Sequence, residues 1–178
     1  MKLAFVIPIN KGGYRGLPVN LRPVSLPSHI IKTLERLVRG VLVNHLEVHN
    51  KLNPYQHGFR NKRSCLSQLL DHHDKVIGYL EDGNNVDSIY LDFATAFDKV
   101  DIGILCHKLK KMGLTGNLGI FLHSFLSDRE QTILANGVSS GLSKVKSGVP
   151  QGAVLGPILL VSPSRSPNIG FSWGLGSL

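Results

Sequence analysis

The sequence VDSIYLDFATAFD, residues 86–98, is the stretch that decides the fold. Residues 86–93 are apolar, β-branched and aromatic, and turn-forming residues bound them, which predicts a buried strand. Asp92 lies at the end of that strand, where burial of an ionised carboxylate is costly unless a cation holds it. Mg²⁺ in phosphoryl-transfer sites binds one or two carboxylates together with phosphate oxygens, so Asp92 is a candidate metal ligand. The alternative is that Asp92 caps the turn that follows.

Phe97 is an aromatic residue just beyond Asp92 in the same stretch. Its ring would lie beside the carboxylate if the chain turns after the strand. An aromatic ring in that place could form one wall of a pocket for the sugar of a nucleotide. Taken alone, Phe97 fits a place in the hydrophobic core better.

A second feature is the sequence SGVPQGAVLGP, residues 147–157. Glycines on both sides of the Pro150-Gln151 pair, Gly152 among them, allow the backbone to approach a ligand closely. The amide of Gln151 can both donate and accept a hydrogen bond. An ordinary loop between a strand and a helix is the alternative, although the spacing of its glycines and prolines is unusual for such a loop.

A third feature is the sequence QHGFRNKRS, residues 56–64, which carries the cations Arg60, Lys62 and Arg63. These residues directly precede an expected helix N-terminus near Ser64. Cations and helix N-termini both favour anions, so the segment predicts contact with phosphate groups. A solvated basic loop is the alternative.

The rest of the chain reads as mixed α and β structure without an internal repeat. Strands are expected at residues 3–9, 21–26, 131–135 and 142–147, the last two on either side of an Asn136-Gly137 turn. Helices are expected at about 28–46, 64–83, 102–112 and 117–127, followed by a short apolar segment at 153–161. The hydroxyl of Ser28 is expected to cap the first helix.

Hydrophobic spacing assigns an inner and an outer side to the first two helices. The inner side of the first helix is marked by Ile30, Ile31, Leu34, Leu37, Val38, Val41, Leu42 and Leu46. Its outer side carries Lys32, Glu35, Arg36 and Arg39. The inner side of the second helix is marked by Leu66, Leu69, Leu70, Ile77 and Leu80.

Charge is distributed unevenly along the chain, whose net charge is +8 and whose pI is about 9.7. Residues 1–75 carry 12 Lys and Arg against 4 Asp and Glu, whereas residues 76–178 carry 8 of each kind. A basic half suggests a surface that faces a polyanion. A solvated basic face explains the charge equally well.

Cysteine usage and hydropathy bear on the cellular setting. Cys65 and Cys106 have no CxxC spacing, which favours a reduced intracellular protein, nuclear or cytoplasmic, over a disulfide framework. No stretch approaches the roughly 20 apolar residues of a membrane span, so no membrane partner is expected. Residues 161–178 are rich in Ser, Pro and Gly without periodicity, and are expected to form a disordered tail. The sequence leaves the oligomeric state open.

Eight segments, in this order, resemble the reverse transcriptase of non-LTR (LINE-like) retrotransposons, from about Lys2 to about Leu160. They are IPINKGG, NLRPVSL, IIKTLERLV, NPYQHGFRNKRSC, YLDFATAFDKVD, FLSDREQ, ANGVSS and SGVPQGAVLGPIL. Each motif alone is a weak signal, but eight collinear matches argue strongly against chance similarity.

The resemblance implies an α+β right-hand polymerase fold. The chain would hold a basic, fingers-like lobe at residues 1–80 and part of the palm at residues 81–160, with no thumb. The expected partners are an RNA template, an RNA–DNA duplex and a dNTP. Asp92, with Phe93 beside it at the metal, would bind the catalytic Mg²⁺ ions.

The resemblance also assigns roles around the nucleotide. Phe97 would be the steric gate that excludes a 2′-OH, while Gln151 and Gly152 would belong to the loop that lines the nucleotide and template pocket. Arg22 and, less securely, Lys11 would reach the incoming triphosphate. The template strand would contact Arg60, Lys62 and Arg63, although Arg60 could instead serve the packing of fingers on palm.

One departure from the family pattern concerns catalysis. In the family, a hairpin with Tyr-x-Asp-Asp follows the GPIL segment, whereas no Asp-Asp pair occurs in these 178 residues. Two-metal phosphoryl transfer needs carboxylates from both strands of the site. We therefore expect a truncated reverse transcriptase fragment that is inactive by itself. The alternatives are a catalytically inactive module that binds RNA or DNA, and a translated relic without function.

Overall fold

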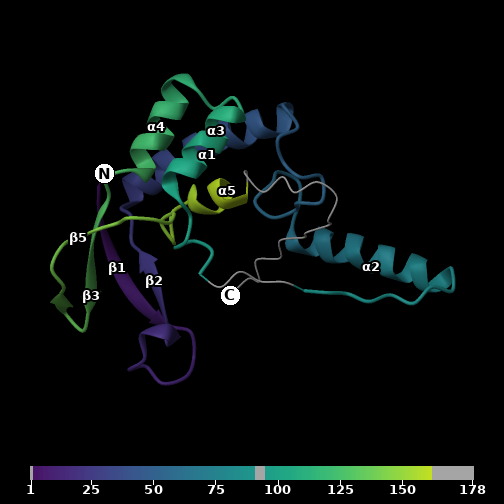
Figure 1. The fold of residues 1–178 in the computed structure, drawn as a ribbon, viewed down its shortest axis with the longest axis horizontal. Coiled ribbons are helices and arrows are strands. Elements are labelled where there is room, and N and C mark those ends of the chain that lie inside the picture. The colour runs from purple at the N-terminus through teal and green to yellow at the C-terminus, as the bar shows by residue number, and fades with distance from the viewer. Residues whose placement is uncertain (1, 91–94, 162–178) are drawn as a thin grey trace.

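A computed structural model of the chain describes residues 2–90 and 95–161 (Figure 1). The strands are β1 (Leu3–Asn10), β2 (Leu21–Ser25), β3 (Glu130–Ala135), β4 (Val138–Ser139) and β5 (Ser143–Lys144). The helices are α1 (His29–Val48), α2 (Cys65–Glu81), α3 (Ile102–Lys111), α4 (Gly116–Leu126) and α5 (Gly156–Val161), with a 3₁₀ turn at Pro18–Asn20. The expected mixture of α and β structure is therefore confirmed.

The sheet joins the two N-terminal strands to three short strands from residues 130–144. β1 pairs antiparallel with β2 and parallel with β3, in the order β2-β1-β3-β4, and β5 also pairs with β3. Ile9 lies opposite Arg22, and Phe5 lies opposite Thr132. This arrangement places the basic N-terminal residues beside the segment that leads into residues 147–157.

The turn between β3 and β4 follows the sequence expectation at Asn136 and Gly137. Their φ values are 52° and 78°, the left-handed backbone that a two-residue hairpin requires. The strand expected at 142–147 is shorter than expected, because only Ser143 and Lys144 pair with β3.

Four helices beside the sheet share one hydrophobic core (Figure 1). Its fully buried members include Leu42, Val43 and Leu46 of α1, Leu122 and Leu126 of α4, and Leu155, Ile158 and Leu159 at α5. Burial of one such leucine or isoleucine side chain contributes about 1.5–3 kcal/mol relative to exposure. The short α5 is therefore fixed by packing, since six residues form too few helical bonds to be stable alone.

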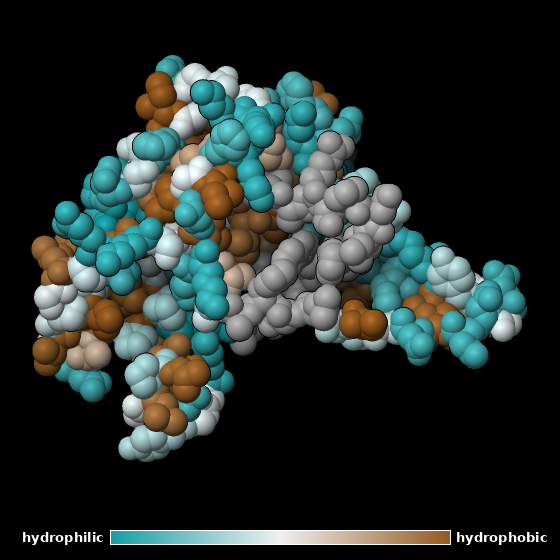
Figure 2. Space-filling model, in the orientation of Figure 1, coloured by the Kyte–Doolittle hydropathy of each residue, from teal (hydrophilic) through white to brown (hydrophobic). Residues whose placement is uncertain are grey.

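Helix α2 extends away from this core (Figure 1). It begins with a reciprocal capping box between Ser64 and Ser67, in agreement with the expected start. Its apolar side chains lie at the surface (Figure 2), where Leu69 is 58% exposed. The expectation that Leu66, Leu69, Leu70, Ile77 and Leu80 are buried is therefore wrong, because no described element covers that side of the helix.

The expected buried strand at 86–93 is wrong for the residues that the structure describes. Residues 84–90 have no regular secondary structure, and Ile89 is 84% exposed. A strand needs the backbone groups of a neighbouring strand, and no described strand pairs with this segment. Leu91, Asp92 and Phe93 lie outside the described residues.

Helix α1 differs from expectation in its orientation on the core. Ile30, Leu34 and Leu37, assigned to the inner side, are exposed, while Glu35, assigned to the outer side, is 1% exposed. The helix is apolar around more than one side, so its spacing did not define a single inner face. Ser28 does occupy the N-cap position, but its side chain makes no capping hydrogen bond.

No helix within residues 2–90 and 95–161 is long and apolar enough to cross a membrane. Residues 162–178, expected to be a tail, lie outside the described residues, and Val161 ends α5.

Candidate functional site

Residues 147–157, here called the palm loop after the place that the sequence resemblance predicts for them, pack against the turn that contains Phe97. The backbone N–H of Gly148 donates to the carbonyl of Val100 at 2.7 Å, and that of Val149 donates to the carbonyl of Phe97 at 2.8 Å. The hydroxyl of Ser147 donates to the carbonyl of Asp98 at 2.9 Å. Two motifs that the sequence separates by about fifty residues are therefore joined by backbone hydrogen bonds.

The glycines of the palm loop are required by close backbone contacts. Gly148 has φ +89°, and a Cβ atom there would lie 2.8 Å from the carbonyl oxygen of Phe97. Gly152 has φ +98°, and a Cβ atom there would lie 2.6 Å from the carbonyl oxygen of Ser25. Both the conformation and the space exclude a side chain, so glycine lets the loop lie against two other segments at once.

The same loop also binds the strand that carries Arg22. The backbone N–H of Ser25, the last residue of β2, donates to the carbonyl of Gln151 at 2.8 Å. Arg22 lies near the start of the same strand and is partly buried. The structure thus connects the segments of Phe97, Gln151 and Arg22, three of the residues that the sequence assigned to nucleotide binding.

Lys11, a further nucleotide-binding candidate, lies beyond the far end of the β1–β2 pair. Its backbone N–H donates to the carbonyl of Asn20 at 2.8 Å, which closes the loop between the two strands, and its side chain is exposed. The pairing of Asn10 with Leu21 separates Lys11 from the palm loop by the length of β2. Lys11 is therefore not brought together with Phe97 and Gln151.

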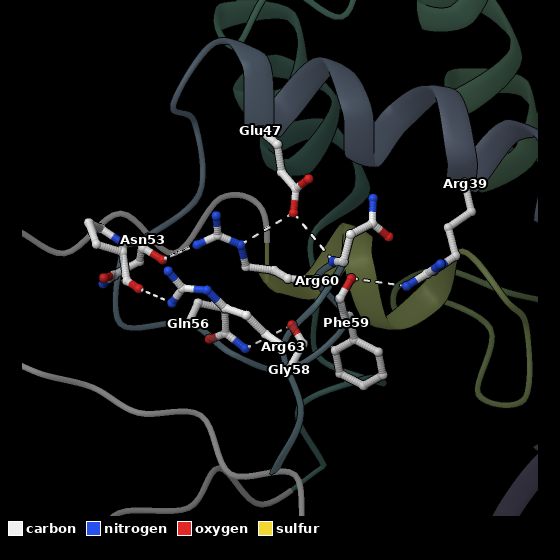
Figure 3. Close-up of polar contacts among 10 residues, drawn as sticks. Arg39, Glu47, Asn53, Gln56, Gly58, Phe59, Arg60 and Arg63 are labelled. Carbon is white, nitrogen blue, oxygen red and sulfur yellow. Dashed lines mark hydrogen bonds and ion pairs between the residues drawn. The ribbon is translucent and has the colours of Figure 1, made fainter. Parts of the chain in front are cut away.

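The basic segment before α2 uses two of its three cations to hold its own fold (Figure 3). Arg60 donates to the carbonyl of Asn53 at 3.1 Å and pairs with Glu47 of α1 at 3.5 Å. Arg63 donates to the carbonyl of Pro54. Lys62 is exposed and has φ +57°, so it presents its charge on a tight turn. The contacts of Arg60 stay within residues 1–80, so they do not test its alternative role in packing fingers on palm, and both Lys62 and Arg63 are exposed.

His57 lies in the same basic segment. Partial burial lowers the pKa of His57, and the nearby Arg63 guanidinium lowers it further. Its Nδ1 lies 2.9 Å from the hydroxyl of Ser67, so the imidazole also contacts the first turn of α2.

Two charged residues that were not predicted to belong to the site, Glu35 and Arg129, form hydrogen bonds with the backbone of the palm loop. Glu35 of α1 accepts hydrogen bonds from the backbone N–H groups of Val154 and Leu155. Arg129 donates to the carbonyls of Leu126 and Gly148. The sequence offered no clear signal for Glu35, because apolar residues lie on several sides of α1 and do not mark its buried face.

The expected metal-binding residues Asp92 and Phe93 lie outside the described residues. Among the residues that are described, no three His, Cys, Asp or Glu side chains gather into a metal-binding group. A cavity of about 510 Å³ lies between α3 and α4, away from the palm loop, and is lined mainly by apolar atoms.

Comparison with known proteins gives the class of this chain. A family model described as reverse transcriptase (RNA-dependent DNA polymerase) matches residues 9–162. The chain therefore belongs to the reverse transcriptase family. Its relatives are polymerases of mobile elements, which confirms the resemblance to non-LTR retrotransposons.

Two relatives illustrate the similarity. The chain is 34% identical over 157 residues to the RNA-directed DNA polymerase from the mobile element jockey of Drosophila funebris. It is 31% identical over 159 residues to the probable RNA-directed DNA polymerase from transposon BS of Drosophila melanogaster. These matches cover 88% and 89% of this chain, which spans only 17% of the length of either relative.

Proposed function

We propose that this chain forms part of a retrotransposon RNA-directed DNA polymerase, the part that holds the template nucleic acid and contributes contacts to the incoming dNTP. Residues 1–80 would be the fingers and residues 81–160 part of the palm of a right-hand polymerase. The observation that carries this proposal is the palm loop, which hydrogen-bonds both to the Phe97 turn and to the strand of Arg22.

The proposed division of labour follows from the chemistry of each residue. Phe97 would restrict space at the sugar, Gln151 and Gly152 would line the base and template pocket, and Arg22 would contact the triphosphate. Arginine suits the last role because its planar guanidinium can bind phosphate oxygens in pairs. Lys11 would contribute only if the β1–β2 loop bends toward the nucleotide.

The metal belongs to the parent enzyme in this proposal. Mg²⁺, when bound, would neutralise charge on the phosphates during phosphoryl transfer. Asp92 supplies a carboxylate that fits such an ion, and the backbone of Phe93 would be next to it. The contribution of the described residues is to bind and orient the nucleotide rather than to hold the ion.

A second candidate function, a catalytically inactive module that binds RNA or DNA, is favoured by the excess of 12 Lys and Arg over 4 Asp and Glu in residues 1–75. The purified chain, given an RNA–DNA primer–template, dNTPs and Mg²⁺, should extend no primer. Primer extension that disappears in the Asp92→Ala variant would contradict this expectation and would show that the chain is itself a polymerase.

Nucleic-acid binding is tested by a salt titration. The probe is an RNA–DNA duplex with a recessed DNA 3′ end, and its affinity for the chain is measured at several salt concentrations. The logarithm of the affinity should fall linearly with the logarithm of salt, because phosphate contacts release counterions. Lys62→Ala should reduce the slope by about one, while Lys144→Ala, an exposed lysine on β5, should not. A flat salt response would contradict the proposal.

A further inference from the structure

We propose that Glu35 is a positioning residue of the nucleotide site, which fixes the palm loop on the segments of Phe97 and Arg22. The inference rests on the proposed function for the meaning of that site. Glu35 touches neither the nucleotide nor the metal in this proposal. It acts through the backbone of Val154 and Leu155.

The contacts of Glu35 are those of an acceptor for loop amides. A single carboxylate oxygen, Oε2, lies 2.6 Å from the backbone N of Val154 and 3.0 Å from that of Leu155. The side chain is 1% exposed, although helix α1 has exposed positions close by at Leu34 and Arg36. A buried carboxylate is costly unless hydrogen bonds compensate it, and two charge-assisted bonds to adjacent amides do so.

Arg129 makes a corresponding contact near the N-terminal end of the palm loop, at Gly148. Its guanidinium is nearly buried and donates to the carbonyls of Leu126 and Gly148. Burial lowers the pKa of Arg129 below its usual value, and no carboxylate in the described part of the chain forms an ion pair with it. Glu35 and Arg129 line the same small cavity, together with Pro150 and Ala153 of the loop. Both charges are therefore directed at the backbone of the loop rather than at each other.

The palm loop is therefore hydrogen-bonded to other segments near both of its ends and in its middle. Arg129 donates to the carbonyl of Gly148, and the backbone N–H of Ser25 donates to the carbonyl of Gln151. Glu35 accepts from the backbone N–H groups of Val154 and Leu155. Gly152 lies between these contacts, and because it has no side chain, its backbone could otherwise adopt many conformations. Loss of the Glu35 contact should release the loop locally and move Gln151 away from its place beside β2.

Hydrogen exchange of individual amides, measured by NMR on the 178-residue chain, tests the positioning itself. In Glu35→Ala, the amides of Val154 and Leu155 should exchange roughly tenfold to a hundredfold faster, the range that corresponds to losing a hydrogen bond to a charged group. Amides in α4, such as that of Leu122, should keep their rates. Glu35→Gln retains an acceptor oxygen without the charge and should give intermediate rates.

Two outcomes of the exchange measurement would overturn the proposal. One is unchanged exchange at Val154 and Leu155 in Glu35→Ala. The other is equal acceleration of every amide, which a purely structural glutamate would produce. Glu81→Ala at the exposed end of α2 is the matched control and should change neither amide. If Glu35→Ala does not fold, Glu35→Gln decides, since its loop amides must then exchange faster than wild type while those of α4 do not.

A nucleotide measurement separates this inference from the proposed function. The probe is 4-thio-dTTP, photo-crosslinked to the chain in the presence of Mg²⁺ and an RNA–DNA duplex with adenine as the next template base. Glu35→Ala should raise the nucleotide concentration for half-maximal crosslinking about tenfold and leave duplex affinity unchanged, whereas Glu81→Ala should alter neither. Absence of crosslinking in the wild type would count against the proposed function, and the exchange rates would still decide the role of Glu35. Equal half-maximal concentrations in Glu35→Ala and wild type would contradict the inference.

Discussion

The core around the palm loop and the projecting helix α2 contain similar leucines in very different surroundings. Leu42 of α1 is 0% exposed and belongs to a core cluster that also contains residues of α3, α4 and α5. Leu69 of α2 is 58% exposed, and Gln68 is the buried residue of that helix. The difference shows that an amphipathic pattern identifies an apolar side, while the partner that covers it must come from another part of the structure.

The largest expected effect is a difference in stability between a variant of the core and a variant of α2. Leu126→Ala removes a fully buried side chain and should lower the free energy of unfolding by about 2–5 kcal/mol, because it leaves a cavity. Leu69→Ala on α2 should change it by less than about 0.5 kcal/mol, since the side chain is already in water. Urea denaturation measures both. Equal destabilisation would mean that α2 is covered by a partner in solution.

The next effect concerns the palm loop itself. Gly152→Ala should lower the free energy of unfolding by about 1–3 kcal/mol, because it adds a side chain at positive φ against the backbone of Ser25. Gly141→Ala is the matched control, since a Cβ atom there meets nothing within 4 Å, and it should have little effect. Thermal melting of both variants tests this, and a neutral Gly152→Ala would contradict the close docking of the loop on β2.

A smaller effect should distinguish the cations of the basic segment. Arg60→Ala removes the contacts to Asn53 and Glu47 and should lower the free energy of unfolding by about 1 kcal/mol. Lys62→Ala should weaken binding to the RNA–DNA duplex without a measurable change in stability. Measurement of both quantities for both variants tests the assignment. A destabilised Lys62→Ala with unchanged binding would reverse the two roles.

The smallest effect is a pH dependence near α2. The pKa of His57 is lowered in the folded chain, so the unfolded chain binds a proton more readily. The contribution of His57 to the free energy of unfolding is therefore fully present above the ordinary His pKa of about 6.5, and it is lost as the pH falls through the folded-state pKa. Stability measured by urea denaturation should decrease on acidification, and His57→Gln should reduce that decrease. An increase in stability on acidification that depends on His57 would contradict the sign.

Local patterns allowed much of the fold to be predicted. The strand at 3–9, the turn at Asn136-Gly137 and the start of α2 at Ser64 depend on short-range chemistry that a sequence displays directly. The strand expected at 86–93 depended instead on a neighbouring strand, and residues 84–90 have no regular structure among the described elements. The orientation of α1 also required tertiary information, because apolar residues lie on several of its sides.

The candidate site was predicted as separate motifs rather than as an assembly. The glycines around Gln151 indicated close backbone approach, and the structure identifies Phe97 and Ser25 as the approached segments. Spacing along the chain gave no means to pair Glu35 with Val154, because the two lie 119 residues apart. Such a contact follows from helix packing, which the local pattern of α1 did not determine.

In the function proposed for this chain, the palm loop, the Phe97 turn and the strand of Arg22 form one nucleotide site. The most direct test is to map, by mass spectrometry, the peptides that 4-thio-dTTP crosslinks in the presence of Mg²⁺ and the RNA–DNA duplex. We expect crosslinks in the segments that contain Gln151, Phe97 and Arg22. Crosslinks confined to the apolar cavity between α3 and α4, or to exposed lysines such as Lys144, would contradict it.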